Sequence, residues 1–342
     1  MYLVPAREID YLSIKLLLER STGGSALKKQ REISRLTKAY RRGDLVIPPN
    51  ETEKQRWWRC EARFMLGDYS DWSGWEYRDE WAATLWHLKP YPVKPWNGLP
   101  TDYLYIIGEQ GIGDEVFFSS CIEECKKRAK RVIFECLPRL QSVFERSFGV
   151  ETVPSDVRGT NRHKKDLPEG VTAWMSLADL PRMWRLSLSM FPSKPFLIAD
   201  PSQIARFSRY KGRTGVSWRG AQGCVSEILK MHPDAISLQY DMAWDEDIET
   251  PDLDLRNDIE GLLGLLMNLE KVVTVSTSVA HFAAALGVET HVIIADPTTG
   301  VRGNIFPWKW ICQKTPGKTP WYESARVYPS INDYRARRQP QG

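Results

Sequence analysis

From residue 101 onward, short runs rich in β-branched and aromatic residues alternate with segments of helical spacing, and only short turns separate them. Parallel strands need long crossover connections, which are usually helices, so this alternation predicts an α/β fold with parallel sheets covered on both faces. The expected strands are Tyr103–Ile107, Val132–Cys136, Gly215–Trp218, Ala235–Leu238, Val272–Val275 and His291–Ala295. The expected helices are a segment ending near Arg128, Leu140–Phe148, Ile259–Leu269 and Ser278–Leu286. The pattern restarts after residue 212, which indicates two βα units.

The N-terminal part follows a different pattern. From Glu8 to about Lys89, apolar residues recur at spacings of three and four, which predicts helices. Thr52 precedes a predicted helix over Glu53–Met65, and a second helix is expected from Asp71 to about Leu88, so that the two form a hairpin. Seven of the 14 tryptophans lie between residues 57 and 96. Rings at this density favour packing between helices over a surface on which nucleic-acid bases stack.

Four prolines between residues 90 and 100 break the helical pattern and predict a linker. At about 100–200 residues per domain, a chain of 342 residues has room for two domains and a smaller module. We therefore expect a helical module over residues 1–98, a first Rossmann-like domain over 101–200 and a second over 201–330.

The composition excludes some classes of protein. With 42% hydrophobic and 26% charged residues, the chain is not disordered throughout. It has no run of about 18 apolar residues and no basic segment followed by an apolar one at its start, so we expect a cytoplasmic protein without membrane insertion. The six cysteines are expected to be reduced and buried. Cys121 and Cys125 have helical spacing, but no histidines cluster near them, so no metal site is predicted.

Charge is distributed unevenly along the chain. The net charge is +4, whereas residues 1–60 alone hold 13 Lys or Arg and 7 Asp or Glu, a local excess of +6. One interpretation is a basic face that binds a polyanion such as DNA. The other is an ordinary solvated helical surface.

A glycine-rich turn, Gly108–Asp114, connects the first expected strand to the following helix. Glycines such as Gly111 and Gly113 allow a ligand to approach the backbone, and a helix N-terminus attracts anions. The turn matches neither the dinucleotide-binding G-x-G-x-x-G pattern nor the P-loop, so an NAD enzyme or a P-loop ATPase is not expected. Asp114 stands directly after the last glycine, at the edge of the sheet where open α/β folds bind ligands. It is either a functional carboxylate or a residue that favours the helix start.

A second motif, Val273–His281, takes a buried strand through three hydroxyl residues into a helix. Ser276, Thr277 and Ser278 either cap this helix or, with its amides, bind a diphosphate. His281 lies one turn further on and is either a binding residue or a structural histidine.

A third motif, Ser217–Gly220, ends the strand that opens the second unit. Arg219 suits paired hydrogen bonds to phosphate, or it is a surface residue after a core strand.

Taken together and in order, the motifs resemble a known family. They are Gly-Glu-Gln-Gly-Ile-Gly-Asp-Glu at 108–115, Met-Ser-Leu-Ala-Asp-Leu-Pro-Arg at 175–182, Ser-Trp-Arg-Gly at 217–220, Ser-Leu-Gln at 237–239, Val-Ser-Thr-Ser-Val-Ala-His-Phe-Ala-Ala-Ala-Leu-Gly at 275–287, Trp-Lys-Trp at 308–310 and Thr-Pro-Trp-Tyr-Glu-Ser-Ala-Arg at 319–326. This series is similar to the glycosyltransferase region that follows tetratricopeptide repeats in many bacterial proteins. That region is related to the heptosyltransferases and, more distantly, to the O-GlcNAc transferases. The stretch from Leu66 to Arg78 resembles the last repeat before it.

The resemblance implies a glycosyltransferase-B fold, with an acceptor-binding first domain and a second domain that binds a nucleotide-diphosphate sugar. It implies a metal-independent, inverting glycosyltransferase without a cofactor, in which Asp114 is the general base. The substrate-binding residues that it implies are Gly111, Gly113, Trp218, Arg219, Gln239, Ser276, Thr277, Ser278 and His281.

The acceptor stays open between a protein, a glycan or a small molecule and DNA with hydroxymethylated bases. An alternative of another class is a non-catalytic binding module with helical repeats and a degenerate transferase domain.

Overall fold

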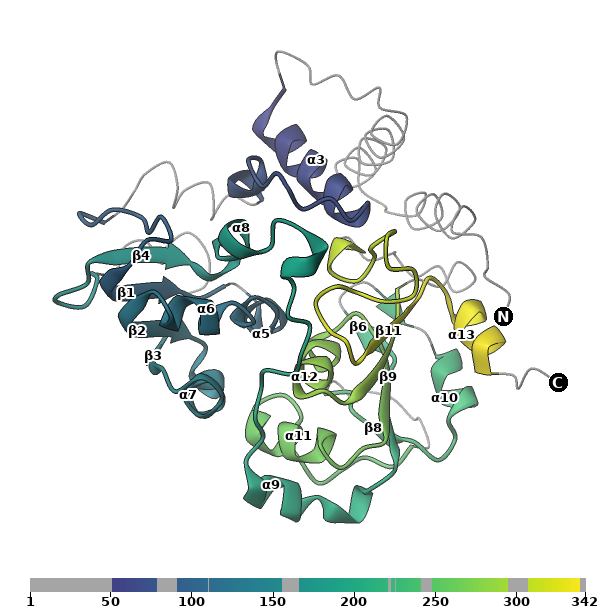
Figure 1. The fold of residues 1–342 in the computed structure, drawn as a ribbon. Helices are drawn as coiled ribbons and strands as arrows, with labels where there is room; N and C mark the ends of the chain where they lie inside the picture. The colour runs from purple at the N-terminus through teal and green to yellow at the C-terminus, as the bar shows by residue number, and fades with distance from the viewer. Residues whose placement is uncertain are drawn as a thin grey trace.

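The structure is a computed structural model of the chain. It describes residues 51–78, 91–109, 111–155, 166–220, 223–224, 226–240, 248–294 and 307–338. Two parallel sheets stand side by side, and the helices α5 (Ile112–Ser119) and α12 (Ser278–Leu286) lie between them (Figure 1). The predicted α/β architecture with parallel sheets is therefore confirmed.

The first sheet has four parallel strands in the order β3-β2-β1-β4. They are β1 (Thr101–Ile107), β2 (Ala129–Cys136), β3 (Glu151–Pro154) and β4 (Ala173–Ser176). Ile107 is in register with Ser176, so the chain leaves β1 and β4 at the same edge. The last five residues of β1 are all buried, as expected for a strand covered on both faces.

The second sheet has five parallel strands in the order β11-β10-β9-β5-β8. They are β5 (Thr214–Ser217), β8 (Ile236–Ser237), β9 (Lys271–Val275), β10 (Glu289–Ile293) and β11 (Ala325–Tyr328). Ser217 is in register with Thr274, so β5 and β9 also end at a common edge. A small antiparallel pair, β6 (Arg219–Gly220) and β7 (Gly223–Cys224), follows β5.

The connections are mainly helical. Besides α5 and α12 they include α6 (Ile122–Lys126), α7 (Gln141–Phe148), α8 (Pro181–Trp184), α9 (Pro201–Arg206), α10 (Glu227–Met231), α11 (Ile259–Leu266) and the terminal α13 (Ile331–Arg338). Short 3₁₀ turns are η2 (Pro138–Leu140), η4 (Leu177–Asp179), η5 (Leu188–Met190), η6 (Ser208–Tyr210) and η7 (Pro307–Lys309). The helix expected to end near Arg128 is in fact two helices. The hydroxyls of Ser119 and Ser120 donate to the carbonyls three residues back, which competes with helical hydrogen bonding at the break.

The described part of the N-terminal module contains the predicted helix with the predicted bounds, α3 (Glu53–Met65). Thr52 and Gln55 form a capping box at its start. The second predicted helix is not seen over its first residues, where the chain forms turns and η1 (Trp75–Tyr77) instead. Residues 79–90 and 1–50 lie outside the described residues. The tetratricopeptide-like character of the module, and the domain bounds, thus stay predictions.

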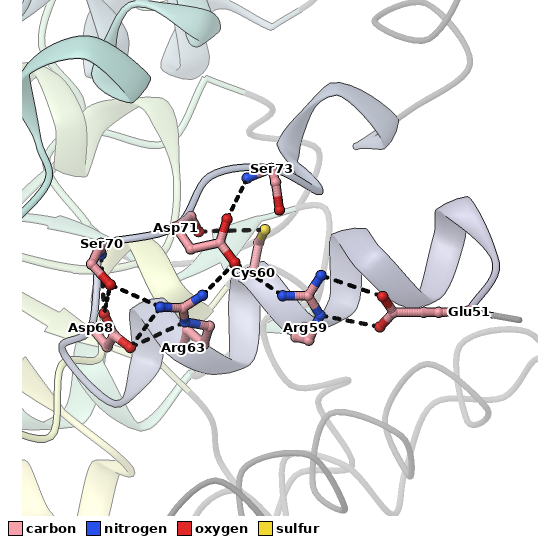
Figure 2. Close-up of polar contacts among 8 residues, drawn as sticks. All are labelled: Glu51, Arg59, Cys60, Arg63, Asp68, Ser70, Asp71 and Ser73. Carbon is pink, nitrogen blue, oxygen red and sulfur yellow. Dashed lines mark hydrogen bonds and ion pairs between the residues drawn. The ribbon is translucent and has the colours of Figure 1, made fainter. Parts of the chain in front are cut away.

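A polar network fastens α3 to the segment after it (Figure 2). Arg59 and Arg63, one helical turn apart, both donate to the carboxylate of Asp71, and Arg63 also pairs with Asp68. Burial raises the pKa of the Asp71 carboxyl, but hydrogen bonds from Ser73, the charge of Arg63 and a hydrogen bond from Arg59 outweigh it, so the net pKa shift is downward. These charges hold the turn against the helix.

Tryptophans dock this segment onto the chain that follows β4 of the first sheet. The indole of Trp72 donates to the carbonyl of Arg185 at 3.1 Å, and that of Trp75 donates to Ala178 at 2.8 Å. Trp58, Trp72, Trp75 and Trp96 are all buried, so the expected packing role is confirmed for them. Trp81 and Trp86 lie outside the described residues.

Two smaller expectations concern thiols and membranes. Five of the cysteines, all but Cys224, are buried and form no disulfide. Burial raises the pKa of Cys60 and of Cys121 to about 12, which keeps both as thiols. In the described residues, no helix combines the length and the hydropathy needed to cross a membrane.

Candidate functional site

Each sheet contains one point at which the strand order reverses direction. In the first sheet the chain moves from β1 to β2 and β3, then returns to place β4 on the other side of β1. In the second sheet β8 lies on one side of β5 and β9 on the other. Ligands of open α/β sheets bind in the crevice that opens at such a switch point, beyond the carboxyl ends of the strands. The glycine-rich turn follows β1, whereas Arg219 and Ser276 follow β5 and β9.

Asp114 lies in the first turn of α5, which follows β1. Gly111 is the N-cap of this helix, and a Cβ there would lie 2.8 Å from Asp114 Oδ2, so any other residue would displace that carboxylate. The Asp114 side chain is 38% exposed. A carboxylate in a helix's first turn favours the helix electrostatically, so this position serves the helix and remains accessible for chemistry.

The second motif forms the turn between β9 and α12. Thr277 is the N-cap of α12, but its side chain makes no capping hydrogen bond and instead lies 3.2 Å from the hydroxyl of Thr274. Ser276 accepts a hydrogen bond from the indole of Trp310 at 2.9 Å. Ser276, Thr277 and Ser278 are all half-exposed. The start of α12 therefore presents hydroxyls and first-turn amides together, which suits an anion.

Gly113 allows α5 and α12 to meet at their N-termini. A Cβ at this position would lie 3.3 Å from Cδ2 of His281 and 3.5 Å from Cα of Ser278. The close contact brings the Asp114 turn of the first unit beside the Ser276–Ser278 turn of the second. Residues 111–114 and 276–281, predicted separately as site residues, thus belong to one place.

Asp114 has a partner that sequence analysis missed. Lys309, in η7, forms an ion pair with its carboxylate. The Lys309 ammonium also lies 5.2 Å from the ring centre of Phe117 and 5.6 Å from that of Phe118, within cation–π range. The only signal for Lys309 was its place inside the Trp-Lys-Trp motif, to which no role was given.

His281 is held inside the structure. It is 5% exposed, stacks on Trp310 with ring centres 4.7 Å apart, and its Nδ1 lies 3.1 Å from the hydroxyl of Tyr322. Burial lowers the pKa of His281 well below its usual value, and the Lys309 charge lowers it further. The ring is therefore neutral near pH 7. It supports the turn at Ser276 by stacking on Trp310, whose indole donates to the Ser276 hydroxyl.

The third motif has both an accessible and a buried part. Arg219 is half-exposed, and Gly220 next to it packs on the Ser276–Thr277 turn, where a Cβ would lie 3.0 Å from Thr277 Cγ2. Gln239 is buried and accepts hydrogen bonds from the Ser217 hydroxyl at 3.2 Å and from the Arg219 amide at 3.1 Å. Its amide side chain thus fixes the path of the chain beyond β5.

Trp218 is predicted as a binding residue, but its side chain is 1% exposed and belongs to the core under the second sheet. A ligand does not reach a ring in that position. Strand alternation explains the difference, because Trp218 and Arg219 are neighbours and point to opposite faces.

A cavity of about 410 Å³ opens at the switch point of the first sheet. Its lining includes Trp57, Glu61, Trp75, Arg78, Glu109, Gly111, Asp114, Phe118, Trp308 and Lys309. Below it, Arg78 donates to Asp179 at 3.1 Å, to Ser176 at 3.0 Å and to Glu109 at 3.2 Å. Sequence analysis did not predict this buried network, because its members come from three separate stretches of the chain.

No group of three or more His, Cys, Asp or Glu side chains within the described ranges is arranged to hold a metal ion. The described residues offer a carboxylate paired with an ammonium, and a helix start whose hydroxyls and amides suit an anion.

No protein-family model matches the chain, and no curated protein matches it. Among solved structures, it is similar to a glycosyl transferase of family 9 from Veillonella parvula DSM 2008, with 10% identity, coverage of 70% of this chain and 89% of that one, and a TM-score of 0.48. It is also similar to the ADP-heptose LPS heptosyltransferase II of E. coli, with 12% identity, coverage of 66% and 90%, and a TM-score of 0.42. A third similar structure is the dodecameric iron-containing heptosyltransferase TibC with ADP-D-β-D-heptose, with 10% identity, coverage of 63% of each chain and a TM-score of 0.34. Likenesses of this extent assign neither a fold nor an activity to the chain.

Proposed function

We propose that the protein is a glycosyltransferase of the glycosyltransferase-B type, which moves a sugar from a nucleotide-diphosphate donor to an acceptor hydroxyl. The observation that carries the proposal is the contact of α5 with α12 at Gly113, because it sets a half-exposed carboxylate beside a helix start suited to a diphosphate. The order of the sequence motifs supports the same reading.

In the proposed reaction, Asp114 accepts the proton of the acceptor hydroxyl while that oxygen attacks the anomeric carbon of the donor. The bond between this carbon and the diphosphate oxygen breaks, and the leaving nucleoside diphosphate keeps the electron pair. A single displacement of this kind inverts the configuration at the anomeric carbon. The Lys309 ammonium pairs with Oδ1 of this carboxylate and so orients it.

The donor diphosphate is assigned to the Ser276–Ser278 turn, the first amides of α12 and the guanidinium of Arg219. These groups donate hydrogen bonds or carry positive charge, so they stabilise the charge that develops on the leaving group. We propose that they do so without a metal ion and without a cofactor, and that transfer is accordingly unchanged in EDTA.

The test is titration calorimetry with UDP, GDP, ADP and CDP, combined with a screen of nucleotide sugars for slow donor hydrolysis. Replacing Arg219 or Ser276 by alanine removes a donor to a charged group, which should weaken diphosphate binding about 10- to 150-fold. The matched control is Arg206→Ala, an exposed arginine on α9 that pairs with Asp258. Unchanged affinity in both site variants would place the donor elsewhere, and absence of any nucleotide binding would remove the proposal.

A further inference from the structure

The Trp-Lys-Trp motif places two neighbouring side chains against the two halves of the proposed site. Lys309 pairs with the Asp114 carboxylate, and the next residue, Trp310, donates from its indole nitrogen to the Ser276 hydroxyl at 2.9 Å. Ser276 lies between β9 and α12, in the turn to which the diphosphate is assigned. Lys309 orients the proposed base, whereas no part of the proposed reaction uses Trp310.

The indole of Trp310 is held in a fixed orientation. Trp310 is fully buried, and its ring stacks on the His281 imidazole with ring centres 4.7 Å apart and an interplanar angle of 26°. The Tyr322 ring lies 5.8 Å from the indole and is also nearly parallel to it, at 30°. The Thr319 hydroxyl donates to the carbonyl of Lys309 at 2.9 Å, which fastens the residue before Trp310. The direction of the indole N–H is therefore set by the packing around it.

The hydrogen bond between Trp310 and Ser276 has only one possible direction. An indole nitrogen donates but cannot accept, so the Ser276 oxygen is the acceptor. A serine hydroxyl carries one hydrogen of its own, and within the described residues that hydrogen of Ser276 has no acceptor. Ser276 is half-exposed, so its hydrogen can point toward a ligand. A hydroxyl that accepts a hydrogen bond is polarised by it and donates more strongly, which favours an anionic partner.

The neighbouring hydroxyl of Thr277 is committed inside the turn. Thr274 donates its one hydrogen to the carbonyl of Val275 at 2.8 Å. The oxygen of Thr274 therefore accepts in its 3.2 Å contact with the Thr277 hydroxyl, and this contact uses the hydrogen of Thr277. Of the two adjacent hydroxyls, Ser276 is thus the one whose hydrogen remains for a ligand.

We infer that Trp310 is a positioning residue of the diphosphate site. Its indole N–H occupies the Ser276 oxygen and so presets the Ser276 hydroxyl as a hydrogen-bond donor to the leaving group. The inference rests on the proposed function for the identity of the ligand. It also accounts for the residue type, because phenylalanine has no donor, and a tyrosine hydroxyl can accept as well as donate, which would leave the direction of the hydrogen bond open.

The first measurement is the affinity of the full chain for inorganic pyrophosphate, by titration calorimetry at constant ionic strength. Trp310→Phe keeps a ring in the stack and removes the donor, which should weaken binding about 3- to 10-fold. In a chain that already carries Ser276→Ala, the same change should alter the affinity by less than about twofold, because the hydroxyl on which it acts is gone. No loss in Trp310→Phe, or losses that multiply in the double variant, would overturn the inference.

The matched control is Trp174→Phe. Trp174 is also buried, and its indole donates to the carbonyl of Val93 at 3.0 Å, but it lies in β4 of the first sheet. The control therefore removes the same kind of hydrogen bond from a buried ring outside the proposed site. Its pyrophosphate affinity should equal that of the wild type, and a loss equal to that of Trp310→Phe would overturn the assignment to Trp310.

The second measurement does not require that Trp310→Phe folds. Uniform ¹⁵N labelling gives one indole N–H signal for each of the 14 tryptophans. The Trp310 signal is identified with Trp310→Phe or, if that variant does not fold, as the signal that Ser276→Ala shifts most, since this change removes its acceptor. Pyrophosphate should shift the Trp310 signal of the wild type, because the Ser276 hydroxyl joins the indole and the anion in one chain of hydrogen bonds. An unmoved Trp310 signal at saturating pyrophosphate would overturn the inference.

Calorimetry with nucleoside diphosphates on the same variants distinguishes this inference from the proposed function. If pyrophosphate binding depends on Trp310 but no nucleoside diphosphate binds, the sugar-donor assignment fails and Trp310 keeps its role at an anion site. If a nucleoside diphosphate binds with an affinity that Ser276→Ala lowers and Trp310→Phe does not, the inference fails alone. If neither pyrophosphate nor any nucleoside diphosphate binds the wild type, both fail.

Discussion

At the scale of single residues, the ion pair between Asp114 and Lys309 is the centre of the proposed reaction. The two residues are 195 positions apart in the chain and meet only because η7 folds back over α5. Sequence analysis could single out Asp114 as a candidate, because it directly follows a glycine-rich strand-to-helix turn at the edge of the sheet where open α/β folds bind ligands. It could not assign Lys309, since no local pattern indicates which distant carboxylate a lysine will meet.

Replacing Asp114 by asparagine tests its role directly. The amide is nearly isosteric but cannot accept the proton, so transfer should fall about 10²- to 10⁴-fold while diphosphate affinity stays unchanged. The measurements are initial rates with the nucleotide sugar that the screen identifies, and calorimetry with its diphosphate. A variant that transfers sugar within threefold of the wild-type rate would leave Asp114 with its helix-start role alone.

His281 gives a prediction on stability against pH. Burial, and then the Lys309 charge, lower its pKa in the folded state, whereas the unfolded chain takes up a proton below about pH 6.5. A lowered histidine pKa makes protonation favour the unfolded state, so stability is lost as pH falls below about 6.5. His281→Asn should reduce the slope of the unfolding free energy between about pH 5 and 6.5 by up to one proton, about 1.4 kcal/mol per pH unit.

Urea unfolding at a series of pH values measures this slope. Tyr322→Phe is the control, because it removes the hydroxyl 3.1 Å from Nδ1 but keeps the buried imidazole. Its slope should match that of the wild type. An unaltered slope in His281→Asn would mean that another group carries the acid sensitivity.

At the scale of elements, the sequence predicted the bounds of a helix best where its periodicity was accompanied by clear signals at both ends. α3 and α12 have the predicted bounds, because each combines helical periodicity with clear ends: Thr52 before the first, and a left-handed glycine, Gly287, after the second. The strands β3, β4 and β11 were missed. Each has only four residues; β3 ends in a proline, β11 contains a charged residue, and β4 is buried on both faces, so none shows a clear strand pattern.

The contact between α5 and α12 carries the element-scale prediction. Gly113→Ala places one methyl group 3.3 Å from His281, which a small shift accommodates. Gly113→Val adds two further methyl groups against α12 and should lower the unfolding free energy by about 1–3 kcal/mol through overpacking. It should also weaken diphosphate binding, because the two helix starts move apart. Equal stability and diphosphate affinity in the alanine and valine variants would show that α5 and α12 are not tightly packed at Gly113.

At the scale of the whole molecule, one hydrophobic core joins the helical segment to both sheets. Phe64 of α3, Phe117 of α5 and Phe282 of α12 belong to the same cluster of buried residues. The alternation of strands and helices predicted the two sheets but not this joint core, because periodicity describes each element and not its partner. The sequence therefore predicted the Gly108–Asp114 and Val273–His281 motifs separately, and only the structure shows that they lie side by side.

The buried arginine at the base of the cavity links the helical segment to the first sheet, and its removal tests that linkage. Arg78 is 6% exposed and pairs with Asp179, which is fully buried, and with Glu109. Arg78→Met keeps most of the side-chain volume but leaves the two carboxylates without this cation, which typically costs about 3–5 kcal/mol.

The matched control for Arg78→Met is Arg182→Met. Arg182 reaches the same Asp179 oxygen at 3.4 Å from a position that is 25% exposed, so its loss should cost less than about 1 kcal/mol. Urea unfolding of both variants, with the intrinsic fluorescence of the tryptophans as the signal, gives the comparison. Because Trp72 and Trp75 report on the docked segment, Arg78→Met should also shift their emission to longer wavelength before the sheets unfold. Equal losses of stability in the two variants would mean that burial of Arg78 does not decide its contribution.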